Sequence, residues 1–352
     1  MKKLLIAILI LAGLAVVLKL TVFKGINKDV EVFEQKSEKM ATSNGKLDKI
    51  IIAGPMANVS HPIFKMMESG ALDDIADKVV FKLWKNPDQL RAMIINKEVD
   101  FVAVPTNVGS ILYNKEQPIK LLNVSVWGIL KILTRDENIK SLDDLKGKEL
   151  IVPWRGDMPD IVLRAVLKKK GFGKDDIKIT YVSNPMDAAK QLIMRRADNI
   201  LLPEPATSMV MRKTKSFPVK VVSPTVFRGI DIQKEWGEAY QREAKIPQAG
   251  MAVVGDMLKN AEAVKKFEAA YEKAMAWYKA NPKKAGELSA KYVTMFTADA
   301  FTDSIEFTQL EVKKAIDVKD ELDFFFNVLK EDSPKIIGGN VPNENFYIKD
   351  QT

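Results

Sequence analysis

The 352-residue chain is 47% hydrophobic, which is enough apolar material for a sizeable core and excludes a disordered tail protein. Its formal net charge is +8, but Lys and Arg are interleaved with Asp and Glu, a pattern typical of a solvated surface and not of a nucleic-acid-binding face. There is no cysteine and one histidine, which excludes disulfides, thiol nucleophiles, Cys-ligated metals and multi-histidine metal sites. We therefore expect neither a metal nor a cofactor.

The first 23 residues have the layout of an export signal, with two lysines, a long apolar run and then Lys19. No good cleavage site follows the apolar run, and Leu14 stands where a lipoprotein signal would carry its acylated cysteine. As a helix, Leu4 to Phe23 would rise about 30 Å, enough to span hydrocarbon. We predict an uncleaved membrane anchor at 1–23, in preference to a cleaved signal peptide, followed by a polar linker at 24–46.

From residue 47 the chain repeats one architectural unit at a constant offset. Each copy is predicted to run strand, loop, helix, strand, helix, strand and loop. Matching residues mark the two copies: Pro55 with Pro153, Asn86-Pro87 with Asn184-Pro185, Asp100 with Asp198, and Pro105 with Pro203. Chance could produce these matches alone, but the matched order of elements argues against it. Two such lobes, with loops at the carboxyl ends of their strands, predict a cleft between them.

Apolar runs and turn residues place the individual elements. The first copy has predicted strands at 49–54, 79–84 and 101–104 and a helix at 88–97, and the second has strands at 149–153, 177–182 and 200–203 and a helix at 187–196. We expect residues 119–134 to cross between the lobes and residues 218–232 to cross back, which makes a hinge. Beyond them we predict a strand at 249–256, helices at 261–282, 283–292 and 304–316, and irregular backbone from Glu331.

The second copy begins in the stretch 141–171, where the local signals are clearest. Ser141 and Asp144 form a capping-box pattern at the start of a short helix, and Gly147 supplies the left-handed residue that ends it. A buried strand follows, and after the loop WRGDMP we expect Asp160 to cap a longer helix. This loop therefore lies at a strand's carboxyl end, where open α/β sheets bind ligands, and free amides in the next helical turn favour an anion or another acceptor.

The run LDDLKGKELIVP, a variable loop and then LRAVLKKKGF resemble the corresponding stretch of ABC-importer solute-binding proteins of the nitrate/sulfonate/taurine class. The resemblance covers roughly Leu47 to Lys330. It implies an α/β, two-lobed fold of the type II periplasmic-binding-protein kind, with a hinge and an inter-lobe cleft behind the N-terminal hydrophobic helix. It further implies lobe one at 47–127 and 226–352, including the C-terminal helices and tail, and lobe two at 128–225.

Polar candidates for ligand contact in the first lobe follow two predicted strands: Asn58, Ser60 and His61 after the first, and Thr106 and Asn107 after the third. The alternative for all of them is to cap the helix that lies ahead. One side chain can cap a helix while backbone amides meet the solute, so the two roles remain open. The lone histidine precedes a proline at a helix start, and capping or a surface position is favoured over catalysis for it.

The remaining candidates are Trp154, Arg155, Gly156 and Asp157 after the strand at 149–153, Glu204 after the strand at 200–203, and Gln248 before the strand at 249–256. A Trp face beside an Arg fork suits a planar or carboxylate-bearing molecule. The alternative is a local ion pair of Arg155 with Asp157, with Trp154 packed between the lobes. Glu204 lies between two prolines and could accept from an amine or hydroxyl, or serve the hinge.

We therefore predict a non-enzymatic, extracytoplasmic solute-binding component of an ABC importer that closes on a small polar solute, anionic or zwitterionic. Its expected partners are the solute, an ABC permease with its ATPase subunit, and the membrane through the N-terminal segment, with no nucleic acid. The expected location is the periplasmic or extracellular face of the cytoplasmic membrane. One alternative is an enzyme like the pyrimidine synthases of the same fold, which rely on a cysteine-rich motif absent here. Another is a ligand-sensing lobe without transport.

Overall fold

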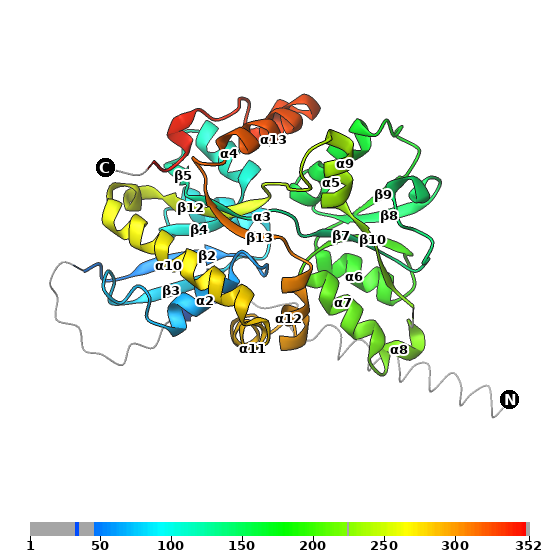
Figure 1. Ribbon diagram of the computed structural model, residues 1–352, viewed down its shortest axis with the longest axis horizontal. Helices are drawn as coiled ribbons and strands as arrows, with labels where there is room; N and C mark the ends of the chain where they lie inside the picture. The colour runs from blue at the N-terminus through cyan, green and yellow to red at the C-terminus, as the bar shows by residue number, and fades with distance from the viewer. Residues whose placement is uncertain (1–31, 35–45, 224, 350–352) are drawn as a thin grey trace.

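The computed structural model describes residues 32–34, 46–223 and 225–349, and their strands form two sheets that lie side by side (Figure 1). The first sheet has the order β1 (Val32–Glu34), β3 (Val79–Leu83), β2 (Ile50–Gly54), β4 (Phe101–Pro105), β12 (Ala249–Val254), β6 (Asn123–Val126) and β13 (Leu310–Lys314), with β5 (Ile119–Leu121) also paired to β12. The second has the order β11 (Phe227–Asp231), β7 (Leu130–Thr134), β10 (Asn199–Pro203), β8 (Glu149–Pro153) and β9 (Lys178–Val182).

The predicted duplication is confirmed in the topology. In one sheet β2 pairs in parallel with β3 and β4, and in the other β8 pairs in parallel with β9 and β10. The two Asn-Pro pairs start equivalent helices, α3 (Pro87–Ile95) and α6 (Pro185–Ile193). The side chain of Asn86 accepts from the Gln89 amide at 2.9 Å, and that of Asn184 accepts from the Asp187 amide at 3.0 Å. The same cap therefore begins the same helix in each lobe.

Local signals in the stretch 141–171 also produce the expected elements. A 3₁₀ helix, η1 (Leu142–Leu145), carries the Ser141 capping box, and Gly147 follows it with φ 74°. The helix α5 (Met158–Lys169) begins earlier than predicted, with Asp157 at its N-cap position and Pro159 in its first turn. The expectation that Asp160 caps α5 is wrong. Because the fixed φ of proline suits the first turn of a helix, Pro159 is already helical and Asp160 lies inside that turn. The carboxylate of Asp160 instead accepts from the Gly156 amide at 2.7 Å.

The return crossing lies later in the chain than predicted. The first crossing connects β6 to β7, inside the expected range 119–134. However, β11 pairs with β7 in the second sheet, and α9 (Ile232–Tyr240) packs against α5. The chain therefore returns to the first sheet in residues 241–248, not in 218–232, and the predicted lobe boundary at 225 is corrected to the end of α9. The register of β11 shifts between Arg228 and Ile230, so this edge strand has no regular alternation to mark it.

Helices cover both faces of each sheet (Figure 1). The remaining helices are α2 (His61–Glu68), α4 (Thr106–Asn114), α7 (Ala206–Lys215), α8 (Val219–Val222), η2 (Gly255–Lys259), α10 (Ala261–Ala280), α11 (Pro282–Tyr292), α12 (Ala298–Glu306) and α13 (Lys319–Asp332).

The helix predicted at 304–316 is wrong in its second half, because residues 310–314 form β13 at the edge of the first sheet against β6. The described tail beyond α13 contains the short turns η3 (Pro334–Ile337) and η4 (Glu344–Phe346).

The predicted anchor at 1–23 and most of the linker at 24–46 lie outside the described residues. Within the linker, however, Val32–Glu34 form β1, which pairs antiparallel with β3. This part of the segment is a strand, so the prediction of a polar tether throughout 24–46 is corrected there. In the portion of the chain that the structure describes, none of the helices combines the length and the apolar character that a membrane crossing requires.

Candidate ligand-binding site

A cavity of about 330 Å³ lies between the two lobes, at the carboxyl ends of parallel strands from both sheets. The first lobe lines it with residues 55–59 after β2, 84–86 after β3 and 103–105 at the end of β4. The second lobe contributes Trp154, Met158 and Pro159 after β8, 183–186 after β9 and 203–206 after β10. Its position agrees with the general rule that open α/β sheets bind ligands beyond the carboxyl ends of their strands.

The wall of this cavity is mainly apolar. Among the described residues that line it, the largest apolar side chains are Met56, Trp84, Ile129, Leu130, Trp154, Met158, Met186, Met295 and Phe296. Methionine is flexible and polarisable, so it adapts its shape to an apolar partner. Such a wall favours a solute with a sizeable apolar body over a small inorganic ion.

Three lining residues carry a buried side-chain N–H without a hydrogen-bond partner in the described part of the chain: Trp84 Nε1, Trp154 Nε1 and Gln248 Nε2. Trp84 is 4% exposed and Gln248 is 2% exposed. Buried donors in folded proteins are nearly always satisfied, so donors that lie around one cavity without a partner mark it as a place for a molecule with acceptors. Trp154 has φ 55°, an uncommon left-handed backbone for a bulky residue, at the point where β8 turns into the cavity wall.

Gln248 lies on the return crossing and reaches the first crossing. Its Oε1 accepts from the Ile129 amide at 2.8 Å, and this fixes the oxygen and leaves Nε2 as the donor. The Ile129 carbonyl in turn accepts from the Glu204 amide at 2.9 Å. A single residue in the first crossing, Ile129, is therefore held by the return crossing on one side and by the end of β10 on the other.

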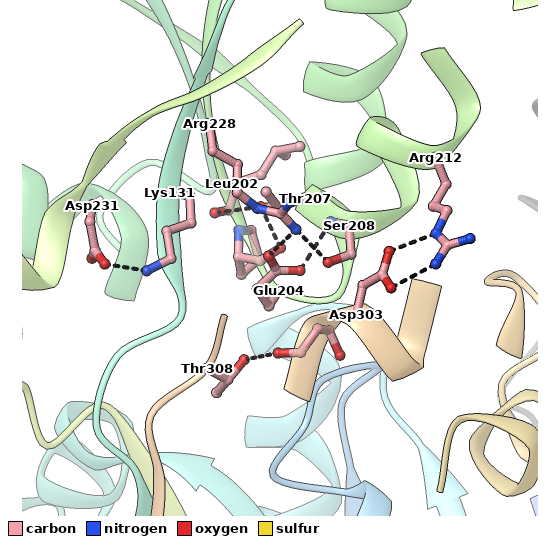
Figure 2. Close-up of polar contacts among 12 residues, drawn as sticks. Lys131, Leu202, Glu204, Thr207, Ser208, Arg212, Arg228, Asp231, Asp303 and Thr308 are labelled. Atoms are coloured by element: carbon pink, nitrogen blue, oxygen red, sulfur yellow. Dashed lines mark hydrogen bonds and ion pairs between the residues drawn. The ribbon is translucent and has the colours of Figure 1, made fainter. Parts of the chain in front are cut away.

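Glu204 lines the cavity, but its carboxylate is bonded to other protein groups. Figure 2 shows Arg228 and Ser208 converging on it. Arg228 Nη2 donates to Glu204 Oε1 at 3.0 Å, and the Ser208 amide donates to Oε2 at 3.0 Å. Burial raises the pKa of this carboxyl, and Arg228 opposes that rise. The predicted contact of Glu204 with a solute therefore competes with an existing ion pair, whereas its backbone bond to Ile129 agrees with the hinge alternative.

The other first-lobe candidates mostly lie behind the cavity wall. Asn58 lines the cavity, but its Nδ2 donates to Thr308 Oγ1 at 2.9 Å and its Oδ1 accepts from Ser304 at 3.2 Å. His61 is buried outside the lining, where its Nδ1 lies 2.8 Å from the Tyr278 hydroxyl and burial lowers its pKa to about 3. This burial corrects the expectation of a surface position for the histidine.

Ser60, Thr106 and Asn107 are buried and do not belong to the described cavity lining. Ser60 occupies the N-cap position of α2, but its side chain makes no capping bond there. Thr106 begins α4 and donates through Oγ1 to the Pro247 carbonyl at 2.6 Å, while Asn107 Nδ2 donates to the Ile336 carbonyl at 3.4 Å. The side chains of Thr106 and Asn107 thus hold α4 to neighbouring segments, and the helix-capping alternative does not describe Ser60, Thr106 or Asn107.

The residues of the loop after β8 lie in two different environments. Trp154 lines the cavity, whereas Arg155 and Gly156 are exposed and lie outside the described lining. The Arg155 guanidinium lies 5.2 Å from the centroid of the Tyr181 ring. Asp157 forms its ion pair across the lobes, with Arg91 of α3 at 2.8 Å, and not locally with Arg155 as the alternative supposed. These positions remove the basis for an anion contact by Arg155.

Sequence reasoning missed Trp84 and the methionines of the wall. Trp84 directly follows β3, two residues before the repeated Asn-Pro pair, so the duplication places it at a strand's carboxyl end. That signal was sufficient to nominate it. The methionines carried no comparable signal, because a methionine near a helix start is equally typical of core packing.

Comparisons with known proteins agree with this architecture. Residues 78–285, more than half of the chain, match the family model described as NMT1/THI5 like. A protein of Brucella abortus (strain 2308), whose name describes it only as a binding protein, is 23% identical over 185 residues, 53% of each chain. The chain thus spans about half the length of the curated relatives that it matches.

Solved structures share the fold at low sequence identity. An ABC transporter structure from Parabacteroides distasonis has a TM-score of 0.71 and 22% identity, and covers 86% of this chain and 100% of its own. The periplasmic aliphatic sulphonate binding protein SsuA from Escherichia coli has a TM-score of 0.67 and 12% identity, with 87% and 93% covered. The nitrate-binding protein NrtA from Synechocystis PCC 6803 has a TM-score of 0.55 and 13% identity, with 73% and 69% covered. The predicted periplasmic-binding-protein-like α/β fold is thereby confirmed.

Proposed function

The chain belongs to the NMT1/THI5-like family, and we propose that it is the extracytoplasmic solute-binding component of an ABC importer. In this proposal the two lobes close on one small molecule and present it to a permease and its ATPase subunit. The names of structural neighbours support the class, since they describe sulphonate- and nitrate-binding proteins. The predicted N-terminal anchor would hold the protein at the outer face of the cytoplasmic membrane.

The observation that carries this proposal is the cavity between the lobes, which strand ends from both sheets line. A molecule in that position contacts both lobes at once, so its binding favours the closed arrangement. The two crossings at 127–129 and 241–248 supply the hinge. We propose binding without catalysis, because the carboxylate in the wall, Glu204, is bonded to Arg228 and Ser208 instead of being paired with a nucleophile.

Native mass spectrometry of protein purified without refolding tests the proposal. We expect a non-covalent mass increment from one small molecule that is lost on denaturation, and the released molecule should rebind to emptied protein in titration calorimetry. Co-purification with a permease would separate transport from a purely sensory role. Absence of any bound molecule, together with no binding across a metabolite panel, would contradict a solute-binding function.

Two neighbouring residues in the β8–α5 loop should differ sharply in their effect on binding of the recovered solute. Trp154→Ala should weaken affinity by about 2 kcal/mol or more, because it removes a large ring from the cavity wall. Arg155→Ala should leave the dissociation constant within about twofold, because Arg155 is exposed and lies outside the lining. Titration calorimetry of both variants, with circular dichroism as a folding check, measures this, and a loss of tenfold or more in Arg155→Ala would restore its role as a ligand contact.

The ion pair between Arg91 and Asp157 should favour the closed arrangement. Asp157→Asn should reduce the closed-to-open ratio about two- to fivefold, since a partly buried ion pair of this kind contributes roughly 0.5–1 kcal/mol. Asp88→Asn is the matched control, because it removes the other carboxylate on Arg91 but leaves the inter-lobe pair. Small-angle scattering without added solute should show a larger mean radius only for Asp157→Asn. Equal radii for both variants would contradict the proposal that the Arg91–Asp157 ion pair favours the closed arrangement.

A further inference from the structure

We propose that the solute is an uncharged molecule with an apolar body about the size of two fused rings and several hydrogen-bond acceptors, which Trp84, Trp154 and Gln248 recognise through their side-chain N–H groups. This inference rests on the proposed solute-binding function and specifies its ligand. It replaces the anionic or zwitterionic solute expected from the sequence. The donors come from both lobes and from the hinge, with Trp84 on the first lobe, Trp154 on the second and Gln248 on the return crossing.

The size follows from the cavity volume. A cavity of roughly 150 Å³ lined by aliphatic and aromatic side chains holds one benzene ring. The cavity here is about 330 Å³, close to twice that volume. Its methionine and aromatic walls would surround the body of a two-ring molecule, whereas nitrate or a short sulfonate would leave much of this apolar surface uncovered.

The absence of net charge follows from the state of the charged and backbone groups. Among the described residues that line the cavity, the ionisable ones are Lys85 and Glu204, and both already have partners. Backbone donors are also scarce, because many residues where the strands meet the helices are prolines, which have no N–H: Pro55, Pro105, Pro159, Pro185, Pro203 and Pro205. Helices α3, α5 and α6 each have proline in the first turn, so each offers one free amide fewer to an anion.

The need for acceptors follows from the three buried N–H groups. Each lies on a cavity-lining side chain and lacks a partner within the part of the chain that the structure describes. A ligand oxygen or ring nitrogen at each would relieve the cost of burying an unpaired donor. At Gln248 the same amide already accepts from Ile129 in the first crossing, so an acceptor bound there would be connected to the hinge through one side chain.

Three probes of matched size test the inference by titration calorimetry: quinolin-2-one, a neutral bicycle with an acceptor carbonyl; naphthalene, which has no such acceptor; and naphthalene-2-sulfonate, an anion. Quinolin-2-one should bind tightest. Trp84→Phe and Trp154→Phe keep an aromatic ring but remove the N–H. Because quinolin-2-one has one acceptor carbonyl, at least one of the two variants should weaken it about three- to tenfold, and both should leave naphthalene unchanged. Trp277→Phe, at a tryptophan outside the described cavity lining, is the control and should change neither affinity.

The outcomes separate this inference from the proposed function. If naphthalene-2-sulfonate binds tightest, or if native protein releases a small anion, the neutral-ligand inference is overturned while solute binding stands. Equal losses for quinolin-2-one and naphthalene in the two variants would assign the tryptophans a packing role and also overturn it. If none of the three probes binds, the neutral-ligand inference is overturned. The proposed function is contradicted as well only if native mass spectrometry also recovers no bound molecule.

Discussion

Replacing Arg228 with methionine is expected to lower the free energy of unfolding by about 3–5 kcal/mol, because it leaves a buried carboxylate without its cation. Glu204 is fully buried, and Arg228 Nη2 lies 3.0 Å from its Oε1. The guanidinium also packs 3.6 Å from the centroid of the Phe307 ring, which connects the second lobe to the segment between α12 and β13. Urea unfolding measures the loss.

The penalty in the Arg228→Met variant should depend on pH in a defined direction. Burial raises the pKa of Glu204 above its ordinary value of 4.5, and Arg228 lowers it. A carboxyl with a higher pKa in the folded chain adds stability below its unfolded pKa, and this contribution is lost as the pH rises through the folded pKa. Without Arg228 the pKa rises further, so the penalty should be smallest near about pH 4 and should grow toward about pH 8.

Two further variants control this prediction. Glu204→Gln in the Arg228→Met background removes the buried charge, so the double variant should be more stable than Arg228→Met alone. Arg212→Met is the matched arginine control, since Arg212 pairs with Asp303 in the same region but is 48% exposed in its side chain (Figure 2). It should cost about 1 kcal/mol or less. Equal losses for Arg212→Met and Arg228→Met would refute the argument from burial.

Phe267→Ala should also lower the free energy of unfolding by about 3–5 kcal/mol, because it leaves a cavity in the core of the first lobe. Phe267 of α10 is fully buried and stacks on Phe101 of β4, with ring centroids 3.8 Å apart. This contact holds the longest described helix against the sheet whose strand ends line the ligand cavity. Urea unfolding measures the effect.

Phe217→Ala is the matched control, because Phe217 is 81% exposed on the second lobe. Its expected change in the free energy of unfolding is within about 0.5 kcal/mol. The two lobes could unfold separately, so the transition should be followed by a probe of each lobe before one free energy is assigned. A Phe267→Ala loss no larger than that of Phe217→Ala would contradict the assignment of the first-lobe core.

Much of the fold was predictable because its signals are local. The Asn-Pro pairs cap α3 and α6 through hydrogen bonds to amides three residues ahead, and such a cap acts wherever the rest of the chain lies. By contrast, β11 and β13 were missed. Both are sheet edges whose pairing partners are distant in sequence, and an edge strand with an irregular register lacks the alternation that reveals a strand.

The candidate site divides in the same way. Its location followed from the sequence, because loops at the carboxyl ends of parallel strands meet at one edge of a sheet. Trp154, Glu204, Gln248 and Asn58, which were predicted as ligand contacts, line the inter-lobe cavity, and their contact with a solute stays a prediction. Whether each of these side chains is free to bond to a solute could not be predicted from the sequence. Glu204 and Asn58 bond to Arg228 and Thr308, which reach them only after the chain has folded.

The sequence by itself determined two βαβ lobes with loops that converge between them, since periodicity, caps and prolines act over a few residues. Only the tertiary structure decided what those loops present to a solute. Asp157 forms an ion pair with Arg91 on the other lobe, while Arg155 is exposed. Trp84 and Trp154 came to line one cavity, and each has a buried side-chain N–H without a partner among the described residues. Hydrogen-bond satisfaction depends on every group that arrives within about 3 Å, and the neighbours that decide it here are distant in sequence.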